Sequence, residues 1–214
     1  MKWEGIGLRL RNQYIRMTAG LRRKKLHDPR FTVISNNCWA GLVYESYGLQ
    51  KQSPTVGMYF MAEEYVKFVS DLPYYIQQCQ LRFIPPENAR HKTFYAQDKR
   101  FGTYPIARLG DVEIAMLHYH SEEEAAQKWN RRCQRICWDR MLVKMNDQNA
   151  CTPEIADRFL SLPIKSKLFF TVSDTIDGEG VVRARDWGMG HIHGLQEPYG
   201  ASGTCDINQI INKL

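Results

Sequence analysis

The sequence lacks the features of a membrane-spanning, exported or disordered protein. None of its apolar runs approaches the ~20 residues that a membrane-spanning helix needs. The first residues contain no apolar core followed by a small-residue cleavage site, so we expect no secretory leader. Charged residues make up 24% of the chain, and no segment is of low complexity, which argues against global disorder. The 214 residues therefore predict a folded protein that can build one sizeable core.

The chain is also too long for its few cysteines to form a disulfide scaffold. Without an export signal, reduced thiols in a cytoplasmic protein are the better interpretation. The six cysteines are Cys38, Cys79, Cys133, Cys137, Cys151 and Cys205.

The signatures of common nucleotide-binding and hydrolytic enzymes are missing. The sequence has no P-loop, no dinucleotide-binding glycine fingerprint, no Gly-x-Ser-x-Gly elbow and no His-Glu-x-x-His pair. His191 and His193 could share a metal with Asp186 or Cys205, but no second spaced pair of ligands accompanies them. We therefore expect no metal site.

Positive charge is concentrated at the beginning of the chain. Residues 1–27 contain eight lysines and arginines and one acid, a net charge of +7, whereas the whole chain carries +6. Apolar residues recur there at helical spacing, at Trp3, Ile6, Leu10, Tyr14, Met17 and Leu21. This basic amphipathic helix suits an anionic membrane surface or an acidic partner. The alternative is a helix packed on its own domain or on a second subunit; we expect no nucleic-acid binding, because no recognisable reading motif accompanies the charge.

The remaining residues, 28–214, alternate strand and helix patterns and predict a single α/β domain. We expect strands at residues 31–34, 81–84, 112–118, 141–145 and 168–172, and helices at 62–70, after Ser121, after Thr152 and after Asp206. Residues 87–103 are polar without a clear period, which predicts an exposed excursion. Strands separated by helices favour a mixed or mostly parallel sheet with helices on both faces, preceded by the basic amphipathic helix.

The stretch around Cys38 resembles an active-site turn. A strand ends here in Ser35, Asn36 and Asn37, and a helix is expected to begin just after the cysteine. Ligands gather beyond the carboxyl ends of parallel strands, and a helix N-terminus stabilises a thiolate or an oxyanion. Cys38 could then act as a nucleophile, with the polar residues as oxyanion or substrate contacts. The alternative is a buried structural cysteine in a tight turn.

His118 is the candidate base for this thiol. It ends the strand expected at residues 112–118, and in a parallel sheet that end would lie on the same edge as Cys38. A histidine that simply meets water at a strand end is the competing interpretation.

Two further groups could hold a substrate. Arg131, Arg132 and Arg135 follow one helix and could bind a phosphate or a sugar nucleotide, although such a run is more often a solvated face. Asp111 and Asp147 could serve a glycosyl- or phospho-sugar transferase, with a divalent metal.

Several segments together are similar to a bacterial family classified only as a domain of unknown function. The resemblance covers about residues 15–175, in order, and Ala40 is a mild departure from a second glycine. The segments are 31–41 (FTVISNNCWAG), 53–57 (SPTVG), 104–111 (YPIARLGD), 118–119 (HY), 123–132 (EEAAQKWNRR), 135–136 (RI), 146–147 (ND), 158–163 (RFLSLP) and 169–171 (FFT).

Members of this family are often labelled exopolysaccharide biosynthesis proteins. The resemblance implies a cytoplasmic α/β protein, peripheral at the inner membrane face, that works in capsule, exopolysaccharide or lipopolysaccharide assembly. Its partner would be a glycan or lipid-linked glycan precursor, and its donor an acyl-CoA or a nucleotide sugar. We expect a transferase and favour acyl transfer through Cys38 and His118. The alternatives are a glycosyl- or phospho-sugar transferase and a non-catalytic glycan-binding or assembly protein; the oligomeric state stays open.

Overall fold

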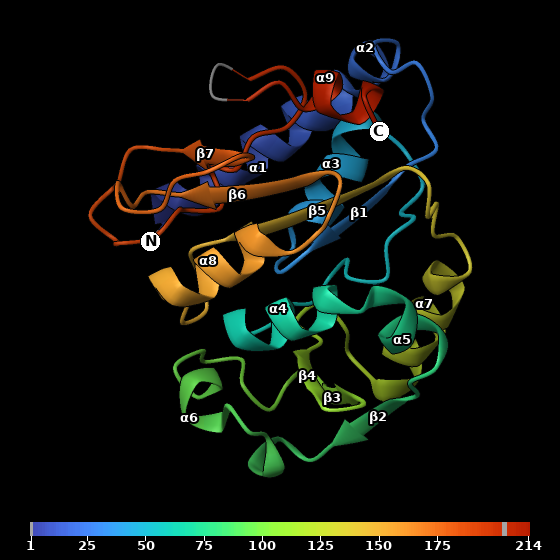
Figure 1. The fold of residues 1–214 in the computed structure, drawn as a ribbon, viewed down its shortest axis with the longest axis vertical. Coiled ribbons are helices and arrows are strands. Elements are labelled where there is room, and N and C mark those ends of the chain that lie inside the picture. Colours follow the sequence, from blue (N-terminus) through green and yellow to red (C-terminus); the bar gives the residue numbers. More distant parts are fainter. Residues whose placement is uncertain (1, 203–204) are drawn as a thin grey trace.

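A computed structural model describes residues 2–202 and 205–214, with side chains described from residue 10 onward (Figure 1). The helices are α1 (Lys2–Met17), α2 (Ala19–Arg23), α3 (Trp39–Tyr47), α4 (Ala62–Ser70), α5 (Leu72–Gln77), α6 (Lys92–Tyr95), α7 (Glu122–Cys133), α8 (Pro153–Ser161) and α9 (Ile207–Asn212), with a 3₁₀ turn η1 (Pro86–Asn88). The strands are β1 (Thr32–Ser35), β2 (Leu81–Ile84), β3 (Ile106–Leu109), β4 (Val112–Ala115), β5 (Met141–Asn146), β6 (Lys167–Thr171) and β7 (Val181–Arg183).

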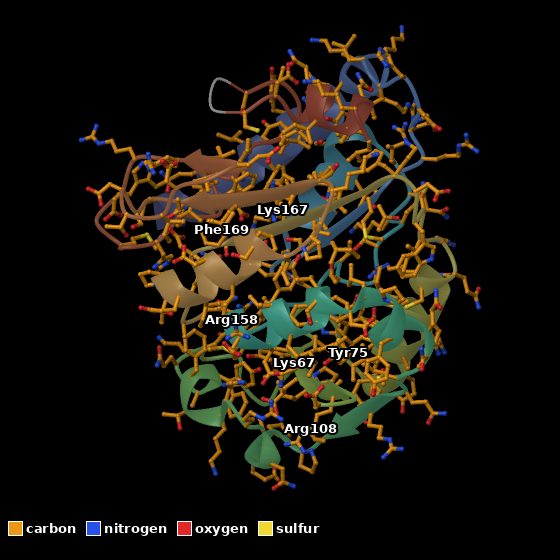
Figure 2. The ribbon with its side chains drawn as sticks, viewed as in Figure 1. Lys67, Tyr75, Arg108, Arg158, Lys167 and Phe169 are labelled. Carbon is orange, nitrogen blue, oxygen red and sulfur yellow. The ribbon has the colours of Figure 1, made fainter. Side chains whose placement is uncertain are left out.

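A four-stranded parallel sheet of order β1-β5-β6-β7 forms one half of the molecule (Figure 1). Its strands alternate their side chains between two apolar cores, as a pleated strand buried on both faces must. One core joins Val33 to α3 and α9, and the other joins Ile34 to α4 and α8. On the second face Phe169 packs against Phe159, with ring centroids 5.9 Å apart (Figure 2). The predicted α/β fold with helices on both sheet faces is confirmed.

A separate antiparallel sheet of order β2-β3-β4 lies below the parallel sheet in Figure 1. β4 pairs with β3 through a tight turn at Gly110 and Asp111, and it has no partner in the parallel sheet. The strand expected at residues 112–118 is therefore shorter than predicted and belongs to the other sheet. The argument that placed His118 on the same sheet edge as Cys38 is wrong for this reason.

Residues 87–103 are anchored to this smaller sheet by two buried carboxylates. Glu113 accepts hydrogen bonds from the backbone N–H groups of Arg90 and His91, at 2.8 and 3.1 Å. Glu64 accepts from the N–H of Glu113 at 3.0 Å and from the His91 ring at 2.8 Å. Most residues of the segment are exposed, as predicted, whereas Tyr95 is fully buried. A polar segment without periodicity can still be ordered when buried acids satisfy its backbone.

Helix caps were the most dependable local signals. The side chains of Ser121, Thr152 and Asp206 each accept a hydrogen bond from a backbone N–H three residues later, and α7, α8 and α9 begin there. In residues 2–202 and 205–214, no helix combines the length and the apolar character needed to cross a bilayer.

The basic N-terminal segment forms α1 and α2, which contact α3. Ile15 and Ala19 are buried, whereas Leu10 and three further members of the predicted apolar stripe are exposed. The stripe's Trp3 and Ile6 lie outside the side chains that the structure describes. The helices therefore pack on the domain through the face that carries Ile15 and Ala19, and the described part of the predicted apolar stripe stays exposed.

We expect Glu113→Ala to lower the free energy of unfolding by about 2–4 kcal/mol, because it removes a buried charge and leaves two backbone N–H groups unpaired. Urea unfolding followed by circular dichroism measures the change. Glu179→Ala is the matched control, since Glu179 is exposed and should tolerate the change. Equal stability of both variants would show that Glu113 does not anchor residues 87–103.

Candidate functional site

The carboxyl ends of β1 and β5 meet at one edge of the parallel sheet. Ser35 pairs in register with Lys144, so the residues that follow each strand lie side by side. Asn36 and Asn37 follow β1, and Asn146 is the last residue of β5. Asn36 Nδ2 donates a hydrogen bond to Asn146 Oδ1 at 2.8 Å, which joins the ends of the two strands. Such an edge is where ligands gather in open α/β sheets.

A buried ion pair forms the centre of this edge. Lys144 is fully buried in β5, and its Nζ contacts the carboxylate of Glu197 from the C-terminal segment. Nζ also donates to Asn37 Oδ1 at 3.0 Å and lies 5.2 Å from the ring centroid of Phe170. Burial lowers the pKa of Lys144, and the negative charge of Glu197 opposes that shift. The lysine therefore depends on Glu197 to remain charged inside the protein.

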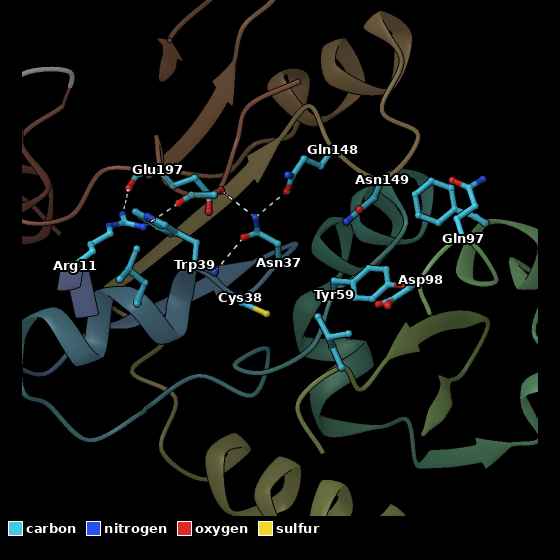
Figure 3. A pocket seen from close by; sticks show the side chains of 14 residues that line it. Arg11, Asn37, Cys38, Trp39, Tyr59, Gln97, Asp98, Gln148, Asn149 and Glu197 are labelled. Atoms are coloured by element: carbon cyan, nitrogen blue, oxygen red, sulfur yellow. Dashed lines mark hydrogen bonds between the residues drawn. The ribbon is translucent and has the colours of Figure 1, made fainter. Parts of the chain in front are cut away.

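Glu197 is held through one oxygen and left open at the other. Its Oε1 accepts from Lys144 and from the Nδ2 groups of Asn37 and Asn146, both at 3.0 Å. No group in the described part of the chain donates to Oε2. Arg11 of α1 donates to the Glu197 carbonyl at 3.1 Å, which fixes the backbone as well (Figure 3). The carboxylate is thus oriented and keeps one oxygen for a ligand.

A pocket of about 570 Å³ opens beside this carboxylate, between the sheet edge and the smaller antiparallel unit (Figure 3). Its volume lies within the range of small-molecule sites. Its apolar and aromatic wall is formed by Trp39, Leu42, Tyr59, Phe94 and Leu117, and its polar groups come from Arg11, Asn37, Gln97, Asp98, Gln148, Asn149 and Glu197.

Cys38 lines the same pocket, but its surroundings disfavour a thiolate. It precedes the first turn of α3, and its Sγ lies 4.0 Å from the Met58 carbonyl. Burial, together with the negative charge of the nearby Glu197, raises the pKa of the thiol to about 12. In residues 10–202 and 205–214 no hydrogen bond joins Cys38 to His118. The predicted thiol–imidazole pair is therefore not assembled in this structure.

His118 itself is exposed and lies next to Leu117 at the pocket wall. Desolvation of its ring and the neighbouring positive charge of Arg100 lower its pKa. Its backbone N–H donates to the Gly57 carbonyl at 2.9 Å. The residue thus adjoins the pocket wall and forms no hydrogen bond with the thiol in the described residues.

Among the other predicted contacts, only Asn37 reaches the pocket. Ser35 and Asn36 are fully buried and support it from below, since Ser35 Oγ donates to Asn37 Oδ1 at 3.0 Å. Asp147 does not line the pocket: its carboxylate accepts from Thr171 Oγ1 and from the N–H groups of Val172 and Ile192. These bonds fix the loops at the sheet edge.

The arginines predicted to bind phosphate do not come together at the pocket. Arg132 is buried and donates to the Val56 carbonyl and to Tyr119, which ties α7 to the loop after α3. Arg131 is exposed, and Arg135 lies beyond the end of α7. Asp111 does not line the pocket either. Its carboxylate accepts a hydrogen bond from Tyr75 and pairs with Lys67, two residues that Figure 2 labels. The structure therefore does not bring these arginines and Asp111 together at the pocket beside Glu197.

The metal interpretation of His191 and His193 gains no support. His193 Nδ1 accepts from the Leu195 N–H at 3.2 Å, and its ring lies against Trp187. In residues 2–202 and 205–214, no group of three His, Cys, Asp or Glu side chains could hold a metal ion.

The central pair was missed by sequence reasoning, although Lys144 left a signal. It stands between Val143 and Met145 in a strand buried on both faces, where an unpaired lysine is rarely tolerated. Glu197 stands in a glycine-rich segment without periodicity, so no local pattern marks it.

We expect Cys38 to be a slow nucleophile. A pKa of about 12 instead of 9.0 lowers the thiolate fraction at pH 8 by about 1,000-fold. Iodoacetamide labelling of the folded protein at pH 8, followed by peptide mass mapping, should modify Cys38 far more slowly than free glutathione. Labelling as fast as that of glutathione would restore the nucleophile prediction.

Breaking the buried pair should destabilise the fold. We expect Lys144→Met to lower the free energy of unfolding by about 3–5 kcal/mol, because Glu197 is left as an uncompensated buried charge. The double variant Lys144→Met/Glu197→Gln should lose less than the two single variants together, which four urea unfolding curves would measure. Strict additivity would show that the two side chains do not interact.

Comparison with known proteins places the chain in a family. A family model described as "Domain of unknown function (DUF1919)" matches residues 10–207. A relative described as an uncharacterised protein, from Haemophilus influenzae (strain ATCC 51907 / DSM 11121 / KW20 / Rd), is 30% identical over 149 residues, which is 70% of this chain and 65% of the relative. Because the matched region covers most of the chain, both halves of the fold and the pocket between them, this protein belongs to the DUF1919 family.

Proposed function

We propose that this protein is a transferase that acts on a sugar-containing precursor of a surface polysaccharide, held in the pocket beside Glu197. The polysaccharide pathway comes from the sequence resemblance described above. The single observation that carries the chemistry is a carboxylate fixed at Oε1 and open at Oε2 in a pocket of small-molecule size.

The pocket wall supports a polyhydroxyl ligand. Tyr59 and Phe94 offer aromatic surface, on which the apolar face of a sugar ring can lie. Gln97 offers an amide, which both donates and accepts hydrogen bonds, as sugar hydroxyls do. The amide of Asn149 donates to the Phe60 carbonyl, and its side-chain oxygen is an acceptor at the pocket. A pocket for an inorganic anion would instead need several unpaired cations.

Glu197 is the proposed general base. Its free oxygen takes the proton of an acceptor hydroxyl while that hydroxyl oxygen bonds to the electrophilic carbon of the donor. The bond from that carbon to the leaving group breaks, and the proton passes from Glu197 to solvent or to the leaving group. Lys144 and Asn37 hold the carboxylate in one orientation during this step.

The same base serves both donors that the resemblance suggests. With an acyl-CoA the carbon is the thioester carbonyl and a thiol leaves; with a nucleotide sugar it is the anomeric carbon and a nucleotide leaves. The high pKa of Cys38 favours direct transfer over a thioester enzyme intermediate. Both donors are cytoplasmic, and the proposal places the reaction there, at the inner membrane face, on a glycan or lipid-linked glycan precursor.

Ligand binding tests the pocket. Titration calorimetry with a panel of hexoses, N-acetylhexosamines, hexuronic acids, uridine diphosphate sugars and acetyl-CoA should reveal a sugar-bearing ligand. Gln97→Ala should weaken its binding about tenfold, because a hydrogen bond between this amide and the ligand is lost. Gln127→Ala, an exposed residue of α7, is the matched control and should bind as the wild type does. A panel in which no sugar binds would contradict the proposal.

Turnover tests the base. We expect Glu197→Gln to lower the transfer rate by about 10²–10⁴-fold, because the amide takes no proton. The substitution also removes the charge that pairs with Lys144, so circular dichroism melting and ligand titration first establish that the variant is folded and still binds the sugar. Transfer is measured by mass spectrometry of the bound sugar with acetyl-CoA or a nucleotide sugar as donor. Sugar binding without transfer from either donor would support the non-catalytic glycan-binding alternative instead.

A further inference from the structure

The outer face of α1 and α2 is apolar and uncovered. Leu10, Tyr14, Met17 and Leu21 are 61%, 59%, 77% and 66% exposed. Their spacing of four, three and four residues puts them on one face, which we call the outer stripe. Contiguous exposure of four large apolar side chains on one helical face is unusual and marks an interaction surface.

Contacts on their other face hold α1 and α2 on the domain, so the helices cannot turn the outer stripe inward. On the other face Ile15 and Ala19 are buried against the domain. Arg22 Nε donates to the Ser46 carbonyl of α3 at 2.7 Å, and Arg11 donates to the Gly194 carbonyl at 3.2 Å. These contacts fix the orientation of the helices, and the outer stripe therefore faces away from the protein.

Positive charge accompanies the stripe: Lys24 and Lys25 flank its C-terminal end, and Arg16 and Arg23 lie further round the same helices; together these four cations are called the basic border. Arg16, Arg23, Lys24 and Lys25 are exposed. Within the residues described from position 10 onward, none of the four forms an ion pair with a carboxylate. The surface thus combines an apolar centre with an uncompensated basic border.

We propose that the outer stripe docks this protein on an anionic lipid bilayer. Its apolar side chains enter the boundary between headgroups and acyl chains, and the four cations contact lipid phosphates. A second copy of the chain fits less well, since a symmetric contact would bring the two basic borders together. This docking is independent of the proposed reaction, because none of the four residues of the outer stripe lines the pocket beside Glu197.

Vesicle co-sedimentation of the full chain tests the proposal. The wild type should bind vesicles of phosphatidylcholine with phosphatidylglycerol and should bind pure phosphatidylcholine at least about tenfold more weakly. Raising the salt to about 0.5 M should weaken the binding, because it screens the cations. Equal binding to both vesicle types, or to neither, would overturn the proposal.

Two variants separate the stripe from its border. Leu10→Glu/Met17→Glu should reduce binding about tenfold or more, whereas Tyr74→Glu, at an exposed aromatic residue of α5, should leave it unchanged. Arg16→Glu/Lys24→Glu should remove most of the preference for anionic lipid. Circular dichroism melting checks that all variants fold. Light scattering tests the alternative of a second copy: a wild-type dimer that becomes monomeric in Leu10→Glu/Met17→Glu would assign the stripe to a dimer interface instead. Loss of vesicle binding in Tyr74→Glu would also contradict the proposal.

Discussion

The ion pair between Lys144 and Glu197 is the interaction on which the sheet edge depends. A lysine in the middle of a sheet that is buried on both faces is tolerated only with a carboxylate beside it. Glu197 stands 53 residues further along the chain, so the pair also fixes where the C-terminal segment crosses the sheet. The amides of Asn37 and Asn146 donate to the same carboxylate oxygen. The position of Glu197 therefore also depends on the residue after β1 and on the last residue of β5. A buried charge pair with its hydrogen bonds satisfied has one well-defined arrangement, because any shift leaves a charge unpaired.

Asp147 adds a second, independent attachment of the same C-terminal segment. Its carboxylate binds the N–H of Ile192 on one side and the end of β6 on the other. Trp39 completes the attachment, since its indole Nε1 donates to the Pro198 carbonyl at 2.8 Å. Residues 192–198 are therefore held near both ends of a short stretch, by side chains from β5, from α3 and from the residue that follows β5. A segment without regular structure thus becomes a reliable wall for a binding site.

Local elements could be predicted from the sequence, but their assembly into a site could not. Ser121, Thr152 and Asp206 mark helix starts because a cap acts through the backbone of the next three residues. Which sheet residues 112–115 join depends on the strands that pair with them, and the alternation of side chains along one strand does not identify those partners. His118 was proposed from a strand end and the arginines from a run along one helix, whereas the structure places the strand before His118 in the other sheet and buries Arg132. The lone lysine of β5 was a usable signal, since its burial requires a partner of opposite charge.

The turn at residues 31–41 does contribute to the pocket, as the sequence predicts. Its polar contact at the pocket is the amide of Asn37, whereas the thiol of Cys38 was the expected reactive group. The N-terminus of α3 does favour negative charge on Cys38, but a helix end acts as only about half a unit charge. Burial and the carboxylate of Glu197 both oppose that charge, and the net effect raises the pKa of the thiol to about 12. Asn37 is subject to no such penalty: it binds Lys144, Glu197 and Gln148 at once and still lines the pocket. Two negative charges would have to share one desolvated corner if Cys38 and Glu197 were both ionised, so the turn can support the carboxylate or the thiolate but not both.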